Sequence, residues 1–333
     1  MLRGKKLGFL TSKQRKNAVN ALKKLFYAES SYGESLANAE IQWISDWAQE
    51  KSNKYDRQML IFRKALKNRI THEMPLQYIL QTQPFHGLTI HCSAPVFIPR
   101  PETEHWVDWI LQRKASMYSR VLDLCTGTGC IGLTMAKKNP SWTVWCVDVD
   151  RKACALAKRN KMMNNIDNAF ILHGNLYEAL TKASGKKSLQ SWQKSQNFDD
   201  QRRSDFSSFF DMIVANPPYI STTEYTDLPL SVRNYESSLS LIGNKTLGSP
   251  RATKDRTQSD LDYLQYYKEI VDTAPFFLKK ANSGEMPSLA LELGTDSQRI
   301  RQLLDKKYSN VQLHTDYAGK ERVITASLDP KYK

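Results

Sequence analysis

Four consecutive residues, Asn216-Pro217-Pro218-Tyr219, follow the apolar run Met212–Ala215 and have the types needed to hold a planar nitrogen group. An amide or exocyclic amine nitrogen is a poor nucleophile because its lone pair is delocalised, so its N–H groups must be held while the lone pair faces an electrophile. The Asn216 side-chain oxygen and the Pro217 carbonyl can each accept one N–H, and the two proline rings fix the backbone. Tyr219 adds an aromatic face that sandwiches the planar group and favours a cation. A turn that merely ends a strand is the alternative.

Such a site needs no strong general base, because the nitrogen proton becomes acidic as the new bond forms. Catalysis would consist mostly of positioning, for which well-aligned reactants supply roughly 7–11 kcal/mol. A second motif must therefore supply the electrophile.

A glycine-containing loop, Cys125-Thr126-Gly127-Thr128-Gly129-Cys130-Ile131-Gly132, follows the apolar run Val121–Leu124. Glycines at the end of a strand let the backbone turn tightly and approach a ligand, while the helix that follows offers free N–H groups. Asp148 comes 21 residues after Gly127, where a carboxylate can accept hydrogen bonds from two ribose hydroxyls. This spacing suits both NAD and S-adenosylmethionine.

Asp123, two residues ahead of the loop, favours S-adenosylmethionine. Its carboxylate can meet the ammonium or sulfonium charge of that cofactor, whereas it would repel the pyrophosphate of NAD. The alternative is a structural role in which Asp123 caps the loop amides. The pattern therefore indicates methyl transfer, with a hydride-transfer enzyme as a weaker alternative.

The elements that must position these motifs alternate strand and helix after residue 119, in the manner of a doubly wound parallel sheet. Both motifs follow strands, and open α/β sheets bind ligands at the carboxyl ends of their strands, so we expect both to face one crevice. The predicted strands are Val121–Leu124, Val144–Val147, Phe170–Leu172, Met212–Ala215 and Leu289–Leu293; the predicted helices are Ile131–Lys138, Lys152–Met163 and Leu261–Leu278; and Val311–Tyr317 with Val323–Leu328 form a closing hairpin around Gly319. A parallel sheet closed by such a hairpin is the class I methyltransferase layout.

The residues before 119 divide into three parts. Apolar residues recur at helical spacing from Ser35 to about Leu80, and prolines and glycines then interrupt the pattern. We expect a basic N-terminal extension at 1–28, a small helical docking domain at 29–86, a connector at 87–118 with short strands at Leu88–His91 and Val96–Ile98, and the methyltransferase domain at 119–333. Two polar stretches, near 183–208 and 244–259, are predicted as inserted surface loops.

Charge and cysteine content restrict the compartment. Eight of the net +14 charges lie in residues 1–28, a segment without acidic residues. This composition is typical of a mitochondrial targeting segment. The alternative is a solvated basic helix, in which case we expect a cytoplasmic protein. Five cysteines without a C-x-x-C pair predict neither a disulfide framework nor a zinc site, and no bound metal is expected. No apolar run is long enough to span a bilayer, and we expect a monomer.

The chain resembles the bacterial and mitochondrial release-factor glutamine methyltransferases, also called the HemK family, from about residue 35 to the C-terminus except for the two inserts. The resemblance is carried by Asn216–Tyr219, by Pro75-Leu76-Gln77-Tyr78-Ile79, by Ile98-Pro99-Arg100-Pro101-Glu102-Thr103-Glu104 and by Asp123–Gly129. It implies transfer of a methyl group from S-adenosylmethionine to the side-chain amide of the glutamine in the Gly-Gly-Gln loop of a class I peptide chain release factor. The helical domain would help to dock that partner.

Family roles carried to matching positions complete the expected site. Catalytic roles fall on Asn216, Pro217 and Tyr219; cofactor contacts on Asp123, Thr126, Gly127, Gly129, Asp148, Asn175 and Asn216; and substrate contacts on Asn216, Pro217, Pro218, Tyr219, Arg233 and Glu236. The chain departs from the family pattern at Cys125, which replaces a glycine, at Asn175, which replaces an aspartate, and at Ser237, which replaces a proline. None of these changes removes a catalytic group.

Three alternatives remain open. An N6-adenine methyltransferase acting on DNA or RNA poses the same geometric problem and would flip its base into the site. The chain has no dedicated basic recognition domain, so a direct nucleic-acid partner is not required. A non-catalytic assembly protein on a methyltransferase scaffold and an NAD oxidoreductase are the other two.

Overall fold

A computed structural model describes residues 9–25, 31–112, 119–183, 209–242, 262–279 and 287–332. The predicted inserts near 183–208 and 244–259 lie outside the described residues, apart from Ala183. The chain forms two compact units, one of residues 1–82 with 229–235 and one of residues 83–228 with 236–333. Across the part of the chain that the structure describes, no helix has the length and apolar character needed to cross a membrane.

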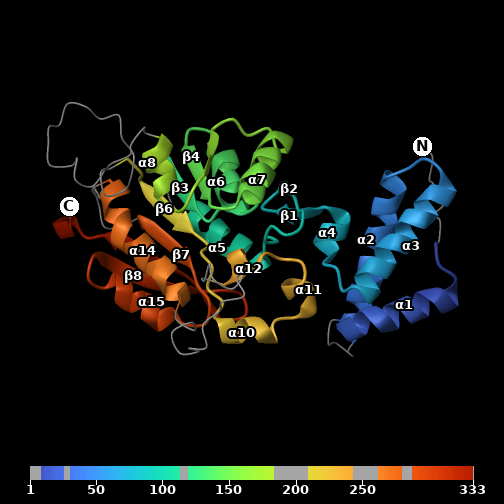
Figure 1. Ribbon diagram of the computed structural model, residues 1–333. Helices are drawn as coiled ribbons and strands as arrows, with labels where there is room; N and C mark the ends of the chain where they lie inside the picture. The colour runs from blue at the N-terminus through green and yellow to red at the C-terminus, as the bar shows by residue number, and fades with distance from the viewer. Residues whose placement is uncertain are drawn as a thin grey trace, which may run out of the picture. The chain divides into compact units, whose positions relative to one another are not determined.

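The first unit is built from helices (Figure 1), which pack around one apolar core. α1 falls within the predicted basic extension, yet its Ala18, Val19 and Leu22 are buried in this core. An ion pair between Arg69 and Glu40, 2.7 Å apart, joins α3 to α2. The helices of this unit are α1 (Ser12–Leu25), α2 (Ser31–Glu50), α3 (Tyr55–Thr71), α4 (Leu76–Leu80) and α11 (Leu230–Arg233).

The second unit is built on a seven-stranded sheet in the order β5-β4-β3-β6-β7-β9-β8. The first five strands of that order are parallel, and β9 runs antiparallel to both of its neighbours. This is the predicted class I methyltransferase layout, including the closing hairpin, so the fold prediction is confirmed. The strands are β3 (Arg120–Leu124), β4 (Thr143–Asp148), β5 (Ala169–His173), β6 (Met212–Ala215), β7 (Leu289–Glu292), β8 (Tyr308–Thr315) and β9 (Glu321–Leu328).

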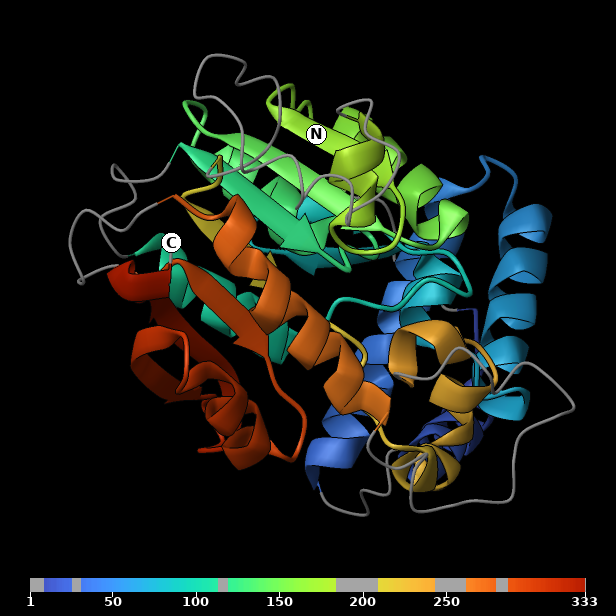
Figure 2. The same cartoon turned by 60° about the vertical axis from the view of Figure 1, so that its left-hand side comes forward.

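Helices cover both faces of this sheet (Figures 1 and 2). α5 (Pro101–Leu111), α6 (Cys130–Lys138) and α7 (Arg151–Met163) pack on one face. α8 (Glu178–Ala183), α14 (Asp262–Phe277) and α15 (Ser297–Leu304) cover the other, where Leu122 and Leu124 of β3 enter the main apolar core. The remaining elements are the paired strands β1 (Thr82–Phe85) and β2 (Leu88–His91), the short helices α10 (Thr222–Asp227) and α12 (Ser238–Leu241), and a 3₁₀ turn at Pro330–Tyr332.

The connector differs from its prediction in two places. The strand expected at Val96–Ile98 is absent, so that prediction is wrong. Pro95 and Pro99 flank the segment and lack the N–H groups that a strand ladder needs, and the Ile98 N–H faces the Glu236 carboxylate instead. Helix α5 was not predicted, although Pro101 at its first position and two glutamates in its first turn are helix-start signals.

Candidate active site

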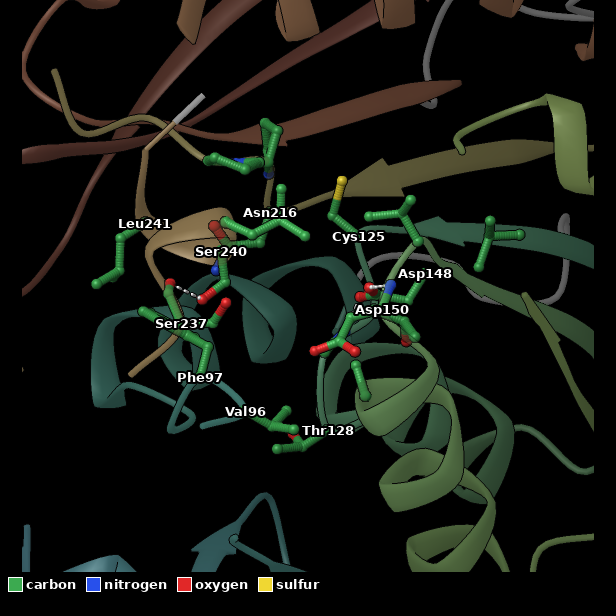
Figure 3. Close-up of a pocket in the computed structure, with 18 of the residues that line it drawn as sticks. Val96, Phe97, Cys125, Thr128, Asp148, Asp150, Asn216, Ser237, Ser240 and Leu241 are labelled. Atoms are coloured by element: carbon green, nitrogen blue, oxygen red, sulfur yellow. Dashed lines mark hydrogen bonds between the residues drawn. The ribbon is translucent and has the colours of Figure 1, made fainter. Parts of the chain in front are cut away.

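One pocket of the second unit lies at the carboxyl edge of the sheet and is lined by both predicted motifs. Figure 3 shows Asn216 and Cys125 on one side of it, Val96 and Phe97 opposite, and Asp148 with Asp150 beside them. Ser237, Ser240 and Leu241 close the remaining side. The loops after β3, β4, β5 and β6 therefore converge on one cavity, as the sheet order requires.

The loop after β3 turns through three left-handed residues, Cys125 (φ 59°), Gly127 (φ 56°) and Gly129 (φ 84°). A Cβ at Gly129 would lie 2.8 Å from the Leu133 side chain, whereas a Cβ at Gly127 would have no atom of a described residue within 4 Å. The amide of Asn160, on α7, donates to the Thr128 carbonyl at 2.9 Å and to the His91 carbonyl at 3.1 Å. Asn160 thus holds the loop from the side of α7, while Gly127 leaves space on the side of the pocket.

Asp148 ends β4 and lines the pocket. One of its carboxylate oxygens accepts from the Gly127 N–H and the other from the Asp150 N–H, both at 2.8 Å. Burial raises the pKa of this carboxyl, and the two N–H donors oppose that shift. Each oxygen keeps a second lone pair, so Asp148 can accept two adjacent hydroxyl groups.

Asp123 does not line the pocket. Its side chain is fully buried, and Oδ2 accepts from the Thr126 hydroxyl at 2.5 Å and from the Gly132 N–H at 2.9 Å. Oδ1 has no hydrogen-bond partner among the described residues, and burial raises the pKa of Asp123 to about 7. This geometry corresponds to the structural alternative weighed from the sequence, in which the carboxyl holds the loop. Thr126 itself does line the pocket.

Asn175 follows β5 and lines the pocket together with Leu176. The preceding Gly174 lies so close to α8 that an added Cβ would come within 2.9 Å of Ala179. The Asn175 carbonyl accepts from the Glu178 N–H at 2.9 Å, which fixes the start of α8. The side-chain amide is therefore presented by a tightly packed turn.

The tetrapeptide after β6 contributes all four of its residues to the lining. Pro217 and Pro218 are buried, whereas Asn216 and Tyr219 are half-buried and keep access to the cavity. The Ile220 N–H donates to the Leu241 carbonyl at 3.0 Å, which ties this turn to the segment at Ser237–Leu241. The structure thus brings together the groups predicted to hold a planar nitrogen and the loop predicted to hold a cofactor.

Glu292, a residue that sequence reasoning missed, lies behind Tyr219 at the end of β7. It is 2% exposed and accepts from the Thr103 hydroxyl at 2.7 Å, the Trp106 indole N–H at 2.8 Å and the Tyr219 hydroxyl at 3.4 Å. A glutamate inside the apolar run Leu289–Leu293 was the available signal, because glutamate is rarely buried without partners.

One wall of the pocket is formed by Val96 and Phe97 together with Pro99 and Thr103 of the segment Ile98–Glu104. Arg100 Nη2 lies 2.6 and 2.8 Å from the two carboxylate oxygens of Glu236, and its guanidinium stacks on Phe97 at 4.5 Å. Glu236 is 4% exposed and does not line the pocket, but Ser237, the next residue, does. The Ser237 N–H donates to the Pro95 carbonyl at 2.8 Å.

Arg233, the remaining predicted substrate contact, is not among the lining residues. It ends α11, which belongs to the first unit. In that unit the neighbouring Tyr235 donates its hydroxyl to the His72 carbonyl at 2.9 Å.

Comparison with known proteins identifies relatives of this chain. The methyltransferase small domain matches residues 109–188. A release factor glutamine methyltransferase of Thermodesulfovibrio yellowstonii is 30% identical over 266 residues, which cover 78% of this chain and 79% of the relative. Proteins of the same description from Flavobacterium psychrophilum, at 30% identity and 83% coverage of both chains, and Fusobacterium nucleatum, at 33% identity, 84% of this chain and 65% of the relative, are also similar.

Proposed function

Because the chain belongs to the release factor glutamine methyltransferase family, we propose that it methylates the side-chain amide nitrogen of the glutamine in the Gly-Gly-Gln motif of a class I peptide chain release factor. The enzyme is dependent on S-adenosylmethionine. The observation that carries the proposal is the single pocket lined by both the loop after β3 and the tetrapeptide after β6.

The residues present fit this cofactor. Asp148 offers two carboxylate oxygens to the ribose hydroxyls, Gly127 leaves its side-chain space open, and Asn175 offers a neutral amide at the next strand end. S-adenosylmethionine supplies an electrophilic methyl group when bound. Thr126 contributes to the lining, while Asp123 and Gly129 act from behind the loop by fixing its turns.

The substrate amide is held by the tetrapeptide. The Asn216 side-chain oxygen accepts one N–H and the Pro217 carbonyl accepts the other, so the nitrogen lone pair faces the methyl group. Tyr219 and Pro218 flank the planar carboxamide. One of these two protons becomes acidic as the N–C bond forms and then leaves the nitrogen, so the main contribution of these residues is alignment.

Glu236 and Arg233 take indirect roles in this proposal. Glu236 holds the pocket segment that begins at Ser237 through its pairing with Arg100, and does not itself contact the substrate. Arg233 belongs to the first unit, which we propose contacts the body of the release factor rather than its glutamine.

The function is tested with labelled S-adenosylmethionine and three acceptors: a mitochondrial release factor, the same factor with its tripeptide glutamine replaced by alanine, and a DNA oligonucleotide. Label that enters the first acceptor and disappears with the glutamine supports the proposal. Label in the oligonucleotide would instead support an adenine methyltransferase.

Asn216→Ala gives a sharper test of the carboxamide site. It should abolish turnover while the dissociation constant for S-adenosylmethionine, measured by calorimetry, changes by less than about threefold, since Asn216 is one of many lining residues. Equal loss of turnover and cofactor affinity would refute its assignment to the substrate.

We also propose that the enzyme works as a monomer in mitochondria, without a nucleic-acid partner. The basic N-terminal composition supports this location. Because Leu22 of α1 is fully buried, a processing event that preserves the first unit must cut ahead of α1. Import of the full chain into isolated mitochondria, followed by N-terminal sequencing, tests this; a mature protein starting after Leu25, or no import, would contradict it.

A further inference from the structure

Two residues at the end of β7 contact Tyr219, the last residue of the tetrapeptide after β6. The Glu292 carboxylate accepts a hydrogen bond from the Tyr219 hydroxyl. Two residues later, Gly294 lies against the Tyr219 ring and backbone. All three residues belong to the second unit. Neither Glu292 nor Gly294 lines the pocket, so they can act on its chemistry only through lining residues that they contact: Tyr219 for both, and Thr103 for Glu292.

The Glu292 carboxylate accepts hydrogen bonds from three side chains. Its Oε2 accepts from Thr103 and Trp106 of α5, while its Oε1 faces Tyr219. The Tyr267 hydroxyl donates to the Glu292 backbone carbonyl at 2.6 Å, which fixes the main chain at the same point. With its side chain and backbone both held, Glu292 presents Oε1 in one direction.

Gly294 explains why the ring can lie where it does. A Cβ built on Gly294 would come within 2.9 Å of Tyr219 Cδ2, 3.2 Å of its carbonyl oxygen and 3.3 Å of its Cβ. Ordinary carbon contacts are about 3.5–4.0 Å, so any other residue would displace the ring. The glycine at this position therefore provides space for Tyr219, while no left-handed backbone requires it.

We propose that Glu292 and Gly294 are positioning residues that set the plane of the Tyr219 ring and, through it, the alignment of the substrate carboxamide. This rests on the proposed role of Tyr219 in binding that group. Thr103 lines the pocket and also donates to Glu292, so the connector helix α5 is held to the same anchor.

The decisive variant is Gly294→Ala. Restoring a normal contact requires a ring shift of about 0.5–1 Å, and misplacement of about 1 Å costs on the order of 100-fold in rate. We expect kcat to fall by roughly that factor, with the dissociation constant for S-adenosylmethionine unchanged within about twofold. The matched control is Gly174→Ala, whose Cβ would crowd Ala179 at 2.9 Å beside Asn175; it should weaken cofactor binding instead.

A double-mutant cycle separates positioning from general damage. In a Tyr219→Ala background, Gly294→Ala should lower kcat by less than about threefold, because the ring it displaces is gone. The same loss of kcat in both backgrounds, or loss of cofactor binding in Gly294→Ala, would overturn the proposal.

Glu292→Gln provides a second variant of unchanged size. We expect kcat to fall by roughly tenfold with unchanged cofactor affinity, and the Trp106 indole N–H resonance, assigned with Trp106→Phe, to shift because its acceptor becomes neutral. That resonance should stay in place in Gly294→Ala, whereas the Tyr219 ring resonances should move. These spectra need no substrate: if the wild-type enzyme methylated no release factor, the proposed function would fail, while unmoved Tyr219 resonances would refute this inference.

Discussion

Variants of the ion pair between Arg100 and Glu236 can show whether Glu236 contacts the substrate or only supports the pocket wall. Glu236 has a side chain that is 1% exposed, and Arg100 contacts both of its carboxylate oxygens. Arg100→Met keeps an unbranched apolar stem but leaves the carboxylate without its cation. Removing one partner of a buried pair costs about 3–5 kcal/mol.

The expected loss is somewhat smaller because Arg100 is 30% exposed, so solvent already screens part of the pair. We expect Arg100→Met to lower the free energy of unfolding by about 2–4 kcal/mol, which corresponds to a fall in Tm of roughly 5–15 °C for a domain of this size. Glu236 already has a raised pKa through burial, so part of the cost is avoided by protonation.

Replacing both residues, in Arg100→Met with Glu236→Met, removes the unpaired charge and should restore stability to within about 1 kcal/mol of the wild type. Denaturant unfolding measures this, and methyl-transfer kinetics on the same samples distinguish the roles. If Glu236 only supports the pocket wall, activity should return together with stability. A stable double variant without activity would refute that reasoning and assign Glu236 to the substrate.

Three further outcomes follow from single side chains. Asp148→Ala removes two charge-assisted acceptors and should weaken S-adenosylmethionine binding by about 3 kcal/mol, or more than 100-fold, in calorimetry; a change under fivefold would exclude Asp148 from the cofactor site. Cys125→Gly should change the free energy of unfolding by less than about 1 kcal/mol, because relief of the left-handed backbone offsets lost packing. Cys125→Val should lower it by over about 2 kcal/mol, and equal stability of the two variants would contradict this reasoning. Asp123 has its pKa raised from 3.8 to about 7, so stability due to its protonated form is full below pH 3.8 and is lost as pH rises through 7. Between pH 5 and 8, the free energy of unfolding should therefore fall with rising pH more steeply in the wild type than in Asp123→Asn, by up to about 1.4 kcal/mol per pH unit. Identical slopes in the two proteins would disprove the shift.

Much of the second unit followed from short-range signals. Apolar runs at all five parallel strands were visible in the sequence. Those at β3, β6 and β7 arise because strands buried on both faces tolerate few polar residues. The short helices α10 and α12 gave no such signal, since four to six residues hold too few turns for a period. Helix α1 was assigned from its charge, and its buried Val19 and Leu22 were outweighed by the lysines around them.

The site was predictable where residues act through their own strand ends. Asp148 and Asn216 follow strands directly, so the sheet order alone brings them to one pocket. The pairs Arg100 with Glu236 and Thr103 with Glu292 join residues 136 and 189 positions apart. Such contacts depend on tertiary packing, which a single sequence does not encode in any local pattern.

Four carboxyl groups, three of them buried and that of Asp148 half-buried, show how packing, rather than residue type, divides these roles. Burial raises the pKa of Asp123, Asp148, Glu236 and Glu292 alike. Asp123 holds the loop after β3, Glu236 pairs with Arg100 before Ser237, and Glu292 accepts a hydrogen bond from Tyr219. Of the four, Asp148 alone lines the cavity, with its two N–H donors on the backbone and spare lone pairs for a ligand. A buried carboxyl receives few hydrogen bonds from water, so protein donors hold the other three in a single orientation. In the proposed function, that rigidity keeps the reacting groups aligned.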